Sequence, residues 1–185
     1  MNIFGDNVVL RAVERTDLPL LHAWANDPEI QFNLGNWHFP LSLAGLERWF
    51  DTFRYDAIDQ RFIVDVPEHG AIGLTNLVNI NWKDRNAFTG LLIGVPALRA
   101  RGYGADCVRT VMRYAFEELQ MERLDTTIIA HNEASLRLYL EKCGWVEEGR
   151  KERAFFRRNR FHDNVILGVT RRRYEALLKN GALEA

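Results

Sequence analysis

Cysteine, net charge and long apolar runs are all scarce in this sequence of 185 residues. Its two cysteines, Cys107 and Cys143, do not make the cysteine framework of secreted domains, so a reducing compartment fits best. The first residues lack the basic segment and apolar run of a signal peptide. The longest uncharged apolar stretch, residues 86–98, contains Gly and Pro and is too short to cross a bilayer. We therefore expect a cytoplasmic protein with no membrane partner.

An excess of charge of either sign is also missing, because 24 basic and 25 acidic residues give a net charge of −1. Such a balance produces no overall field to attract nucleic acid or anionic lipid. Basic residues do cluster at 150–160 and 171–173. We interpret them as solvated strand and helix faces, because they lack the aromatic and basic interleaving of a known nucleic-acid-binding module. We expect no nucleic-acid partner.

Linkers, repeats and metal-ligand spacings are absent from the sequence as well. The uninterrupted chain predicts a single domain over residues 1–185, and its 47% hydrophobic residues supply a core. The five histidines are scattered without the spacing to cysteines or carboxylates that a metal site requires. We therefore expect no bound metal.

The order of predicted elements indicates an α/β protein with a mixed sheet. Two short joins, at residues 67–70 and 83–85, are typical of hairpins, so the middle of the sheet should be antiparallel. A later run of strand, helix, strand, helix and strand excludes both an all-parallel doubly wound fold and a sandwich. The expected strands are 7–13, 61–66, 71–82, 86–95, 123–130, 145–153 and 160–168, and the expected helices are 16–26, 43–53 after a cap at Ser42, 103–119, 133–142 and 170–178.

Residues 92–104 carry the most informative pattern: an apolar strand, a basic turn with glycines and the start of a long amphipathic helix. The free N–H groups and the dipole at a helix N-terminus attract anions, and glycines let phosphate oxygens approach the backbone. Arg99 and Arg101 add positive charge there. The segment predicts a phosphate-binding turn.

Other phosphate-binding motifs fit this turn less well. Gly102 and Gly104 are followed by Cys107, where a dinucleotide fingerprint needs a third Gly or an Ala. The Gly-Lys-Ser/Thr signature of nucleoside triphosphate sites is missing. A helix that is merely capped by glycines remains the alternative without a ligand.

Two segments resemble the GCN5-related N-acetyltransferases (GNAT). Residues 99–104, Arg-Ala-Arg-Gly-Tyr-Gly, fit the signature Arg/Gln-x-x-Gly-x-Gly/Ala of that family. Residues 132–149 resemble its second motif, in which Asn132 to Ser135 open a helix, Leu138-Tyr139 follows and Cys143-Gly144-Trp145 leads into a strand. The resemblance extends over nearly the whole chain and is strongest to the branch with ribosomal-protein N-terminal, spermidine and aminosugar acetyltransferases. It implies one α/β domain with a mixed, mostly antiparallel sheet, a splayed central parallel strand pair and flanking helices.

The resemblance further implies that acetyl-CoA is the acetyl donor. The turn would hold its pyrophosphate through the residues Arg99, Arg101, Gly102, Tyr103 and Gly104. The pantetheine arm would lie between the splayed strands at residues 91–95 and 126–130, against the backbone of Ile93 and Val95. Asn132 and Ser135 would lie near this arm, although both are also ordinary helix-capping residues, and the two roles can coexist.

By the same resemblance Tyr139 faces the thioester sulfur and assists departure of the thiolate. A tyrosine with a pKa of about 10 is a weaker acid than a thiol with a pKa of about 8.5, so full proton transfer is uphill by about 2 kcal/mol. A hydrogen bond to the developing thiolate is therefore the expected role. The alternative is an aromatic core residue on an apolar helix face.

The base that deprotonates the amine is not evident from the sequence. Many relatives carry Glu where this chain has Phe88, and Glu29, His38 and His131 are substitutes that each have a structural or solvated alternative. An acyl-cysteine route is disfavoured because neither cysteine is placed to have a lowered pKa, so we expect direct transfer.

The acceptor should be a small metabolite or a peptide N-terminus with a single primary amine. The segments expected over the acetyl group, residues 29–53 and 145–163, include Trp37, Phe39 and Trp49, and the first of them has few acids. Several carboxylates would be needed to bind spermidine. A non-catalytic CoA-binding or sensing module is the alternative function, and the assembly is left open between a monomer and a homodimer.

Overall fold

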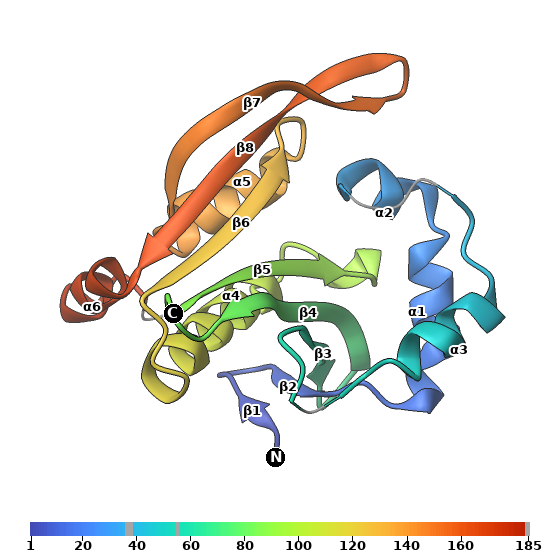
Figure 1. Cartoon of the computed structure of the whole chain (residues 1–185), viewed down its shortest axis with the longest axis horizontal. Coiled ribbons are helices and arrows are strands. Elements are labelled where there is room, and N and C mark those ends of the chain that lie inside the picture. Colours follow the sequence, from blue (N-terminus) through green and yellow to red (C-terminus); the bar gives the residue numbers. More distant parts are fainter. Residues whose placement is uncertain (36–38, 55, 184–185) are drawn as a thin grey trace.

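One mixed sheet of eight strands organises the protein, as the computed structural model shows for residues 1–35, 39–54 and 56–183 (Figure 1). The strand order across the sheet is β1-β2-β3-β4-β5-β6-β8-β7. The strands are β1 (Ile3–Phe4), β2 (Val9–Ala12), β3 (Gln60–Val66), β4 (Gly70–Asn81), β5 (Asn86–Ile93), β6 (Arg123–Ile129), β7 (Val146–Arg157) and β8 (Arg160–Thr170).

Neighbouring strands are antiparallel except for β5 and β6, which are parallel. The parallel register covers only three pairs, from Asn86 opposite Arg123 to Phe88 opposite Asp125. Beyond Phe88 the two strands diverge, which is visible in the middle of Figure 1. The fold class expected from the sequence, including the splayed central pair, is confirmed.

Helices cover both faces of this sheet. A 3-10 turn, Arg15–Asp17, precedes the first helix, another, Pro96–Leu98, follows β5, and π-helical segments, Tyr114–Glu118 and Leu138–Lys142, continue α4 and α5. The α-helices are α1 (Leu18–Ala25), α2 (Pro28–Asn33), α3 (Leu43–Phe50), α4 (Tyr103–Arg113), α5 (Glu133–Arg137) and α6 (Arg171–Lys179).

Two buried clusters lie on opposite faces of the sheet because successive strand residues point to opposite sides. Val64 packs in the larger cluster with α4 and α5, whereas its neighbour Ile63 packs in the smaller cluster with α1 and α3. The indole of Trp24 on α1 is 5% exposed and lies against Gly94 at the end of β5. The sheet face that carries α1 and α3 and the opposite face that carries α5 are therefore connected through the gap between the diverging strands β5 and β6.

Some predicted boundaries need correction. The strand expected at 7–13 is shorter, the helix expected to reach residue 53 ends at Phe50, and β1 and α2 were not predicted. The cap at Ser42 is confirmed, since its Oγ accepts a hydrogen bond from the Gly45 N–H at 3.0 Å. No helix within the described ranges is long and apolar enough to cross a membrane.

Candidate active site

The turn between β5 and α4 has the backbone conformation of an anion-binding loop. Gly102 is the N-cap of α4 with φ of +91°, a left-handed conformation that glycine adopts without strain. Gly102 has no side chain with which to cap the first helical turn, and a Cβ built at Gly102 would have no described atom within 4 Å beyond its chain neighbours. The N-terminal N–H groups of α4 and the open space beside Gly102 therefore fit a phosphate group.

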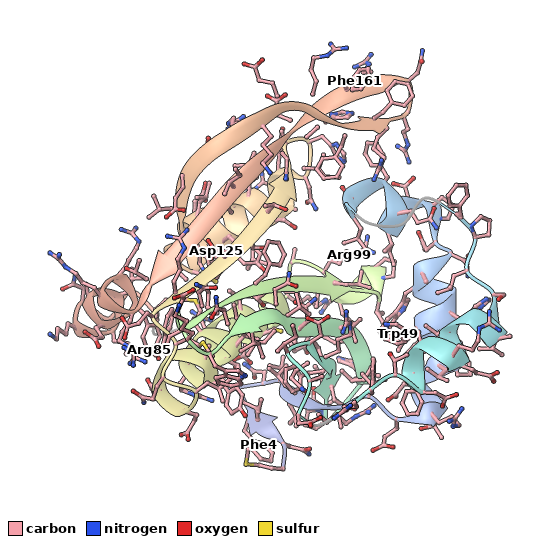
Figure 2. The ribbon with its side chains drawn as sticks, in the orientation of Figure 1. Phe4, Trp49, Arg85, Arg99, Asp125 and Phe161 are labelled. Carbon is pink, nitrogen blue, oxygen red and sulfur yellow. The ribbon has the colours of Figure 1, made fainter. Side chains whose placement is uncertain are left out.

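The two predicted arginines of this turn are held by its own backbone. Arg99 Nε donates to the carbonyl of Ile93 at 3.1 Å, and Arg101 Nε donates to the carbonyl of Ala97 at 3.0 Å. Figure 2 labels Arg99 near the end of β5. Both guanidinium groups keep further N–H donors for an anion at the helix start.

The two sequence motifs come together at the start of α4. A Cβ built at Gly104 would lie 3.4 Å from the side chain of Leu138, and Cys143 Sγ lies 3.9 Å from the carbonyl oxygen of Ala105. Tyr103, Ile93 and Val95 are partly buried and pack against the core on either side of the turn. The phosphate-binding turn is thus adjacent to the helix that carries Tyr139.

A cavity of about 430 Å³ passes through the gap between β5 and β6. Its walls come from both faces of the sheet, and they include three of the predicted site residues, Asn132, Ser135 and Tyr139. The other seven predicted residues are outside the described wall. The remaining wall residues are Leu21, Trp24, Asn33, Leu34, Gly35, Leu41, Leu46, Trp49, Arg61, Leu74, Asn76, Phe88, Gly90, Leu91, Leu92, Thr126, Thr127, Ile128, Ile129 and Phe155.

Tyr139 forms part of the cavity wall on the α5 side while being only 4% exposed. Its ring packs edge-on against Trp145, with centroids 5.0 Å apart and an interplanar angle of 88°. Trp145 is fixed in turn by its indole N–H, which lies 3.3 Å from Met112 Sδ. Burial raises the pKa of Tyr139, with smaller increases from Cys107 and Cys143. The hydroxyl therefore stays protonated and can donate a hydrogen bond.

Asn132 and Ser135 form a helix cap at the cavity wall. Asn132 Oδ1 accepts a hydrogen bond from the Ser135 N–H at 3.1 Å, so the capping interpretation is confirmed. The same two residues line the cavity. Capping and a role at the cavity are compatible in this geometry.

The candidate bases that the structure describes, Glu29 and His131, do not line the cavity. Phe88 lines it, so the position at which many relatives carry Glu presents an apolar ring here. Glu29 is largely exposed and pairs with Arg158, and His38 lies outside the described residues. His131 Nε2 lies 3.1 Å from the carbonyl oxygen of Phe32, and burial and the nearby His162 lower its pKa. Among the described wall residues there is no carboxylate and no histidine.

The two cysteines lie apart from the described wall of this cavity. Cys107 and Cys143 are buried and unpaired, neither lines the described wall, and burial raises the pKa of both thiols. The described part of the chain contains no cluster of three or more His, Cys, Asp or Glu side chains that could hold a metal ion.

Arg61 on β3 and Phe155 on β7 are wall residues that the sequence did not identify. They come from strands far from the two motifs along the chain. Alternation along β3 places Arg61 on the same face as the buried Ile63, and this unusual position for a charge was the available signal.

Comparison with protein families agrees with this geometry. Residues 7–146 match the acetyltransferase (GNAT) domain. The chain is 27% identical over 171 residues to the SPbeta prophage-derived uncharacterized N-acetyltransferase YokL of Bacillus subtilis, covering 92% of this chain and 94% of that protein. It is 28% identical over 170 residues to spermidine N(1)-acetyltransferase of Vibrio cholerae, covering 92% and 96% of the two chains.

The fold is likewise similar to that of solved acetyltransferases. The crystal structure of the Vibrio cholerae spermidine N-acetyltransferase in complex with CoA and spermine superposes with a TM-score of 0.82 at 27% identity, covering 91% of this chain and 98% of that one. The chain therefore belongs to the GNAT acetyltransferase family. It is an acetyl-CoA-dependent N-acetyltransferase, which transfers an acetyl group from acetyl-CoA to an amine.

Proposed function

We propose that the amine attacks the acetyl thioester directly inside the cavity and that Tyr139 stabilises the departing thiolate. The observation that carries this proposal is the position of Tyr139, a buried hydroxyl on the wall of a cavity that crosses the gap between β5 and β6. Its raised pKa disfavours full ionisation, so its contribution is a hydrogen bond that strengthens as charge develops on sulfur.

The proposed acetyl-CoA site follows the diverging strands. The pyrophosphate would bind the helix start at Gly102 and Gly104, between Arg99 and Arg101, with Tyr103 beside them. The pantetheine arm would lie along β5, near the backbone of Ile93 and Val95, and pass Asn132 and Ser135. The open space at Gly102 leaves room for a phosphate, and the contact between Gly104 and Leu138 places the turn next to the helix that carries Tyr139.

The proton of the amine leaves through water in this proposal. The described cavity wall has no carboxylate or histidine, and Phe88 occupies the position of the usual Glu. An amine that binds in its neutral form has already lost its ammonium proton to solvent, so no protein group is needed to remove a proton before attack. After attack the nitrogen carries one extra proton, which a relay of water molecules passes to solvent.

The proposed acceptor is a small metabolite or a peptide N-terminus with a single primary amine. The relative from Vibrio cholerae acts on spermidine, but a polyamine binds best where several carboxylates match its ammonium groups. The described wall supplies none and is built mainly from aromatic, aliphatic and neutral polar side chains. This composition supports one amine on a compact molecule.

The test is a thiol-release assay with acetyl-CoA and a panel of aminosugars, amino acids, N-terminal peptides and polyamines. Release of CoA thiol with a single-amine compound at the highest kcat/KM supports the proposal. Spermidine as the best acceptor would contradict it. Absence of thiol release with every amine would favour a non-catalytic CoA-binding module.

We also propose the location, the domain organisation and the partners of the enzyme. A cytoplasmic location is supported by two buried, unpaired cysteines, which fit a reducing compartment. We further propose that residues 1–185 act as a single domain, without nucleic acid or membrane as partners, and that a homodimer is compatible with activity. Sedimentation of the purified chain tests the assembly.

A further inference from the structure

The cavity contains a single charged side chain among its described wall residues. That residue is Arg61, from the middle of the sheet on the α1–α3 face, and the other described wall residues are neutral. A positive charge is unexpected in a pocket whose substrate is an amine, because an ammonium group gains nothing from approaching it. Arg61 therefore requires an explanation other than attraction of the amine.

The guanidinium group of Arg61 lies over two aromatic rings. Its central carbon is 5.6 Å from the ring centroid of Trp49 and 6.0 Å from that of Phe53. The two rings pack at a steep angle, with centroids 4.5 Å apart. Trp49, labelled in Figure 2, extends from α3 and is itself part of the cavity wall. The aromatic pair thus lies within cation–π distance of the guanidinium group without accepting hydrogen bonds from its N–H groups.

The N–H donors of Arg61 have no hydrogen-bond acceptor among the described residues of the protein. Within residues 1–35, 39–54 and 56–183 its guanidinium makes no hydrogen bond, and its ion pair is a long one, 4.0 Å to Asp59. Asp59 Oδ1 already accepts a hydrogen bond from the Asn79 N–H at 2.8 Å. The Arg61 side chain is 24% exposed, so its charge is partly withdrawn from water. It is a positioned donor without a strong acceptor.

We infer that Arg61 binds an anionic oxygen group of the acceptor, so that the substrate is an amine that also carries a carboxylate or a phosphate. This inference rests on the proposed function, because it assigns the class of acceptor to the same cavity. A guanidinium edge presents two parallel N–H donors that match the two oxygens of such a group. The neutral wall between Arg61 and Tyr139 then accommodates the body of the substrate.

The arrangement orients the acceptor as well as selecting it. An oxyanion held at Arg61, on the β3 and α3 side, directs the rest of the molecule toward Tyr139 on the α5 side, where the thioester is proposed to lie. A polyamine is disfavoured for two reasons, since it has no group for Arg61 and its distal ammonium groups would be repelled by the guanidinium. A neutral aminosugar would bind without an ionic interaction with Arg61.

The experiment compares acceptors that differ only in the anionic group. Amino acids are paired with their amides, and aminosugar phosphates with the corresponding aminosugars, while spermidine provides the cationic reference. We expect the wild type to prefer the anionic member of at least one pair by about 10- to 100-fold in kcat/KM, as for a hydrogen-bonded ion pair. The pair that shows the preference distinguishes a carboxylate from a phosphate substrate.

Two variants test whether Arg61 causes that preference. Arg61→Gln should reduce the ratio within the pair to about one, mainly by raising KM for the anionic acceptor, while the KM for acetyl-CoA stays unchanged. Arg48→Gln removes the same charge from an exposed position on α3 outside the described cavity wall and should leave the ratio intact. Retention of the acetyl-CoA-induced rise in Tm shows that each variant is folded.

Failure of the Arg61 inference and failure of the proposed function give different experimental results. Equal use of both members of every pair by the wild type, or an unchanged ratio in Arg61→Gln, overturns the inference while leaving acetyl transfer established. If no amine releases thiol, the proposed function fails, and binding of N-acetylamino acids and their amides is compared by Tm instead. In that case a shift by the acid alone, lost in Arg61→Gln, supports the anionic subsite, and any other result overturns it.

Discussion

The imidazole of His131 stacks on the phenyl ring of Phe32, with the ring centroids 4.0 Å apart and the planes inclined by 22°. The contact joins the segment after β6 to α2, across 99 residues of sequence. His162 packs edge-on against the same imidazole at 4.4 Å, and Arg158 lies over the Phe32 ring at 4.0 Å. This cluster attaches α2 to the β7–β8 hairpin, beside two wall residues of the cavity, Asn33 and Leu34.

Attachment of α2 should weaken in acid because of His131. Burial and the neighbouring His162 lower its pKa below the unfolded value of about 6.5, so the folded state favours the neutral ring. The resulting stability is present above about pH 6.5 and is lost as the pH falls through the folded pKa. We expect the protection factors of the α2 amides, which are corrected for the intrinsic pH dependence of exchange, to fall between about pH 7.5 and 5.

A matched pair of variants separates this effect from general acid unfolding. His131→Phe should remove much of the pH dependence of the α2 protection factors, because the ring stack is kept without a titrating group. His69→Gln, at an exposed position in the turn between β3 and β4, should keep the wild-type dependence. Equal pH profiles in all three proteins would exclude His131 as the origin.

Substitution of Tyr139 should affect turnover more than binding. Tyr139→Phe should lower kcat by about ten- to a hundredfold and leave the Kd for acetyl-CoA near its wild-type value, because the hydrogen bond strengthens in the transition state. Tyr174→Phe is the matched control, since it removes a buried hydroxyl that donates to Glu117 at 2.7 Å outside the described cavity wall. Equal kcat in both variants would make Tyr139 a packing residue.

Bulk at Gly102 should block acetyl-CoA. Gly102→Trp places a side chain in the open space beside the helix start, so the rise in Tm caused by acetyl-CoA should disappear. Gly102→Ala has the same strained φ, worth about 1–2 kcal/mol, but little bulk, and should retain most of the rise. NAD should not raise the Tm of the wild type. A full acetyl-CoA effect in Gly102→Trp would contradict the assignment of the turn.

Gly94 should be intolerant of even one methyl group. A Cβ built there would lie 2.1 Å from Cε2 of Trp24, in a position where the indole is confined by the core. Gly94→Ala should therefore destabilise the protein by about 1–3 kcal/mol, as for other overpacked sites. Gly149→Ala, where no atom lies within 4 Å of the new Cβ, should leave the unfolding midpoint in urea nearly unchanged. Similar midpoints for the two variants would show that Trp24 can move away.

The pH dependence of the reaction should follow the acceptor. If no protein base operates, kcat/KM rises about tenfold per pH unit below the pKa of the amine, because only the neutral amine attacks. We expect this slope between about pH 6 and 8 for an amine with a pKa above 9, in the wild type and in His131→Gln. A bend below about pH 6.5, where the lowered pKa of His131 lies, that moves or vanishes in His131→Gln would instead identify His131 as the base.

The sequence was most informative where short-range patterns determine structure. The hairpins of β3, β4 and β5 follow from alternating strands and short turns, and the cap at Ser42 from its position before an apolar helical repeat. The divergence of β5 from β6 came from the family resemblance, since no local pattern indicates where two distant strands separate. The helix start at Gly102 was predictable because glycine and charge act within a few residues of the turn.

The features that could not be predicted from the sequence depend on contacts between distant segments. Helix α2 has a capping residue, Asp27, and a proline at its first position, but six residues with one buried side chain give too short a repeat to recognise. The π-helical turn Leu138–Lys142, which carries Tyr139, departs from the 3.6-residue period only in three dimensions. Arg61 became a site candidate only when strand alternation and the packing of α3 placed it in the cavity.

The gap between β5 and β6 also bears on how this protein avoids self-association. An unpaired strand edge is ordinarily a template on which another polypeptide can add, and this sheet carries two such edges in its interior. An added strand would need both neighbours at about 4.8 Å and room for side chains above and below. Here α1 and α3 pack on one face and α5 on the other, so the gap is a cavity of about 430 Å³ flanked by helices and not an open sheet edge. The protein can thus present backbone donors and acceptors to a ligand while the flanking helices hinder the addition of a foreign strand.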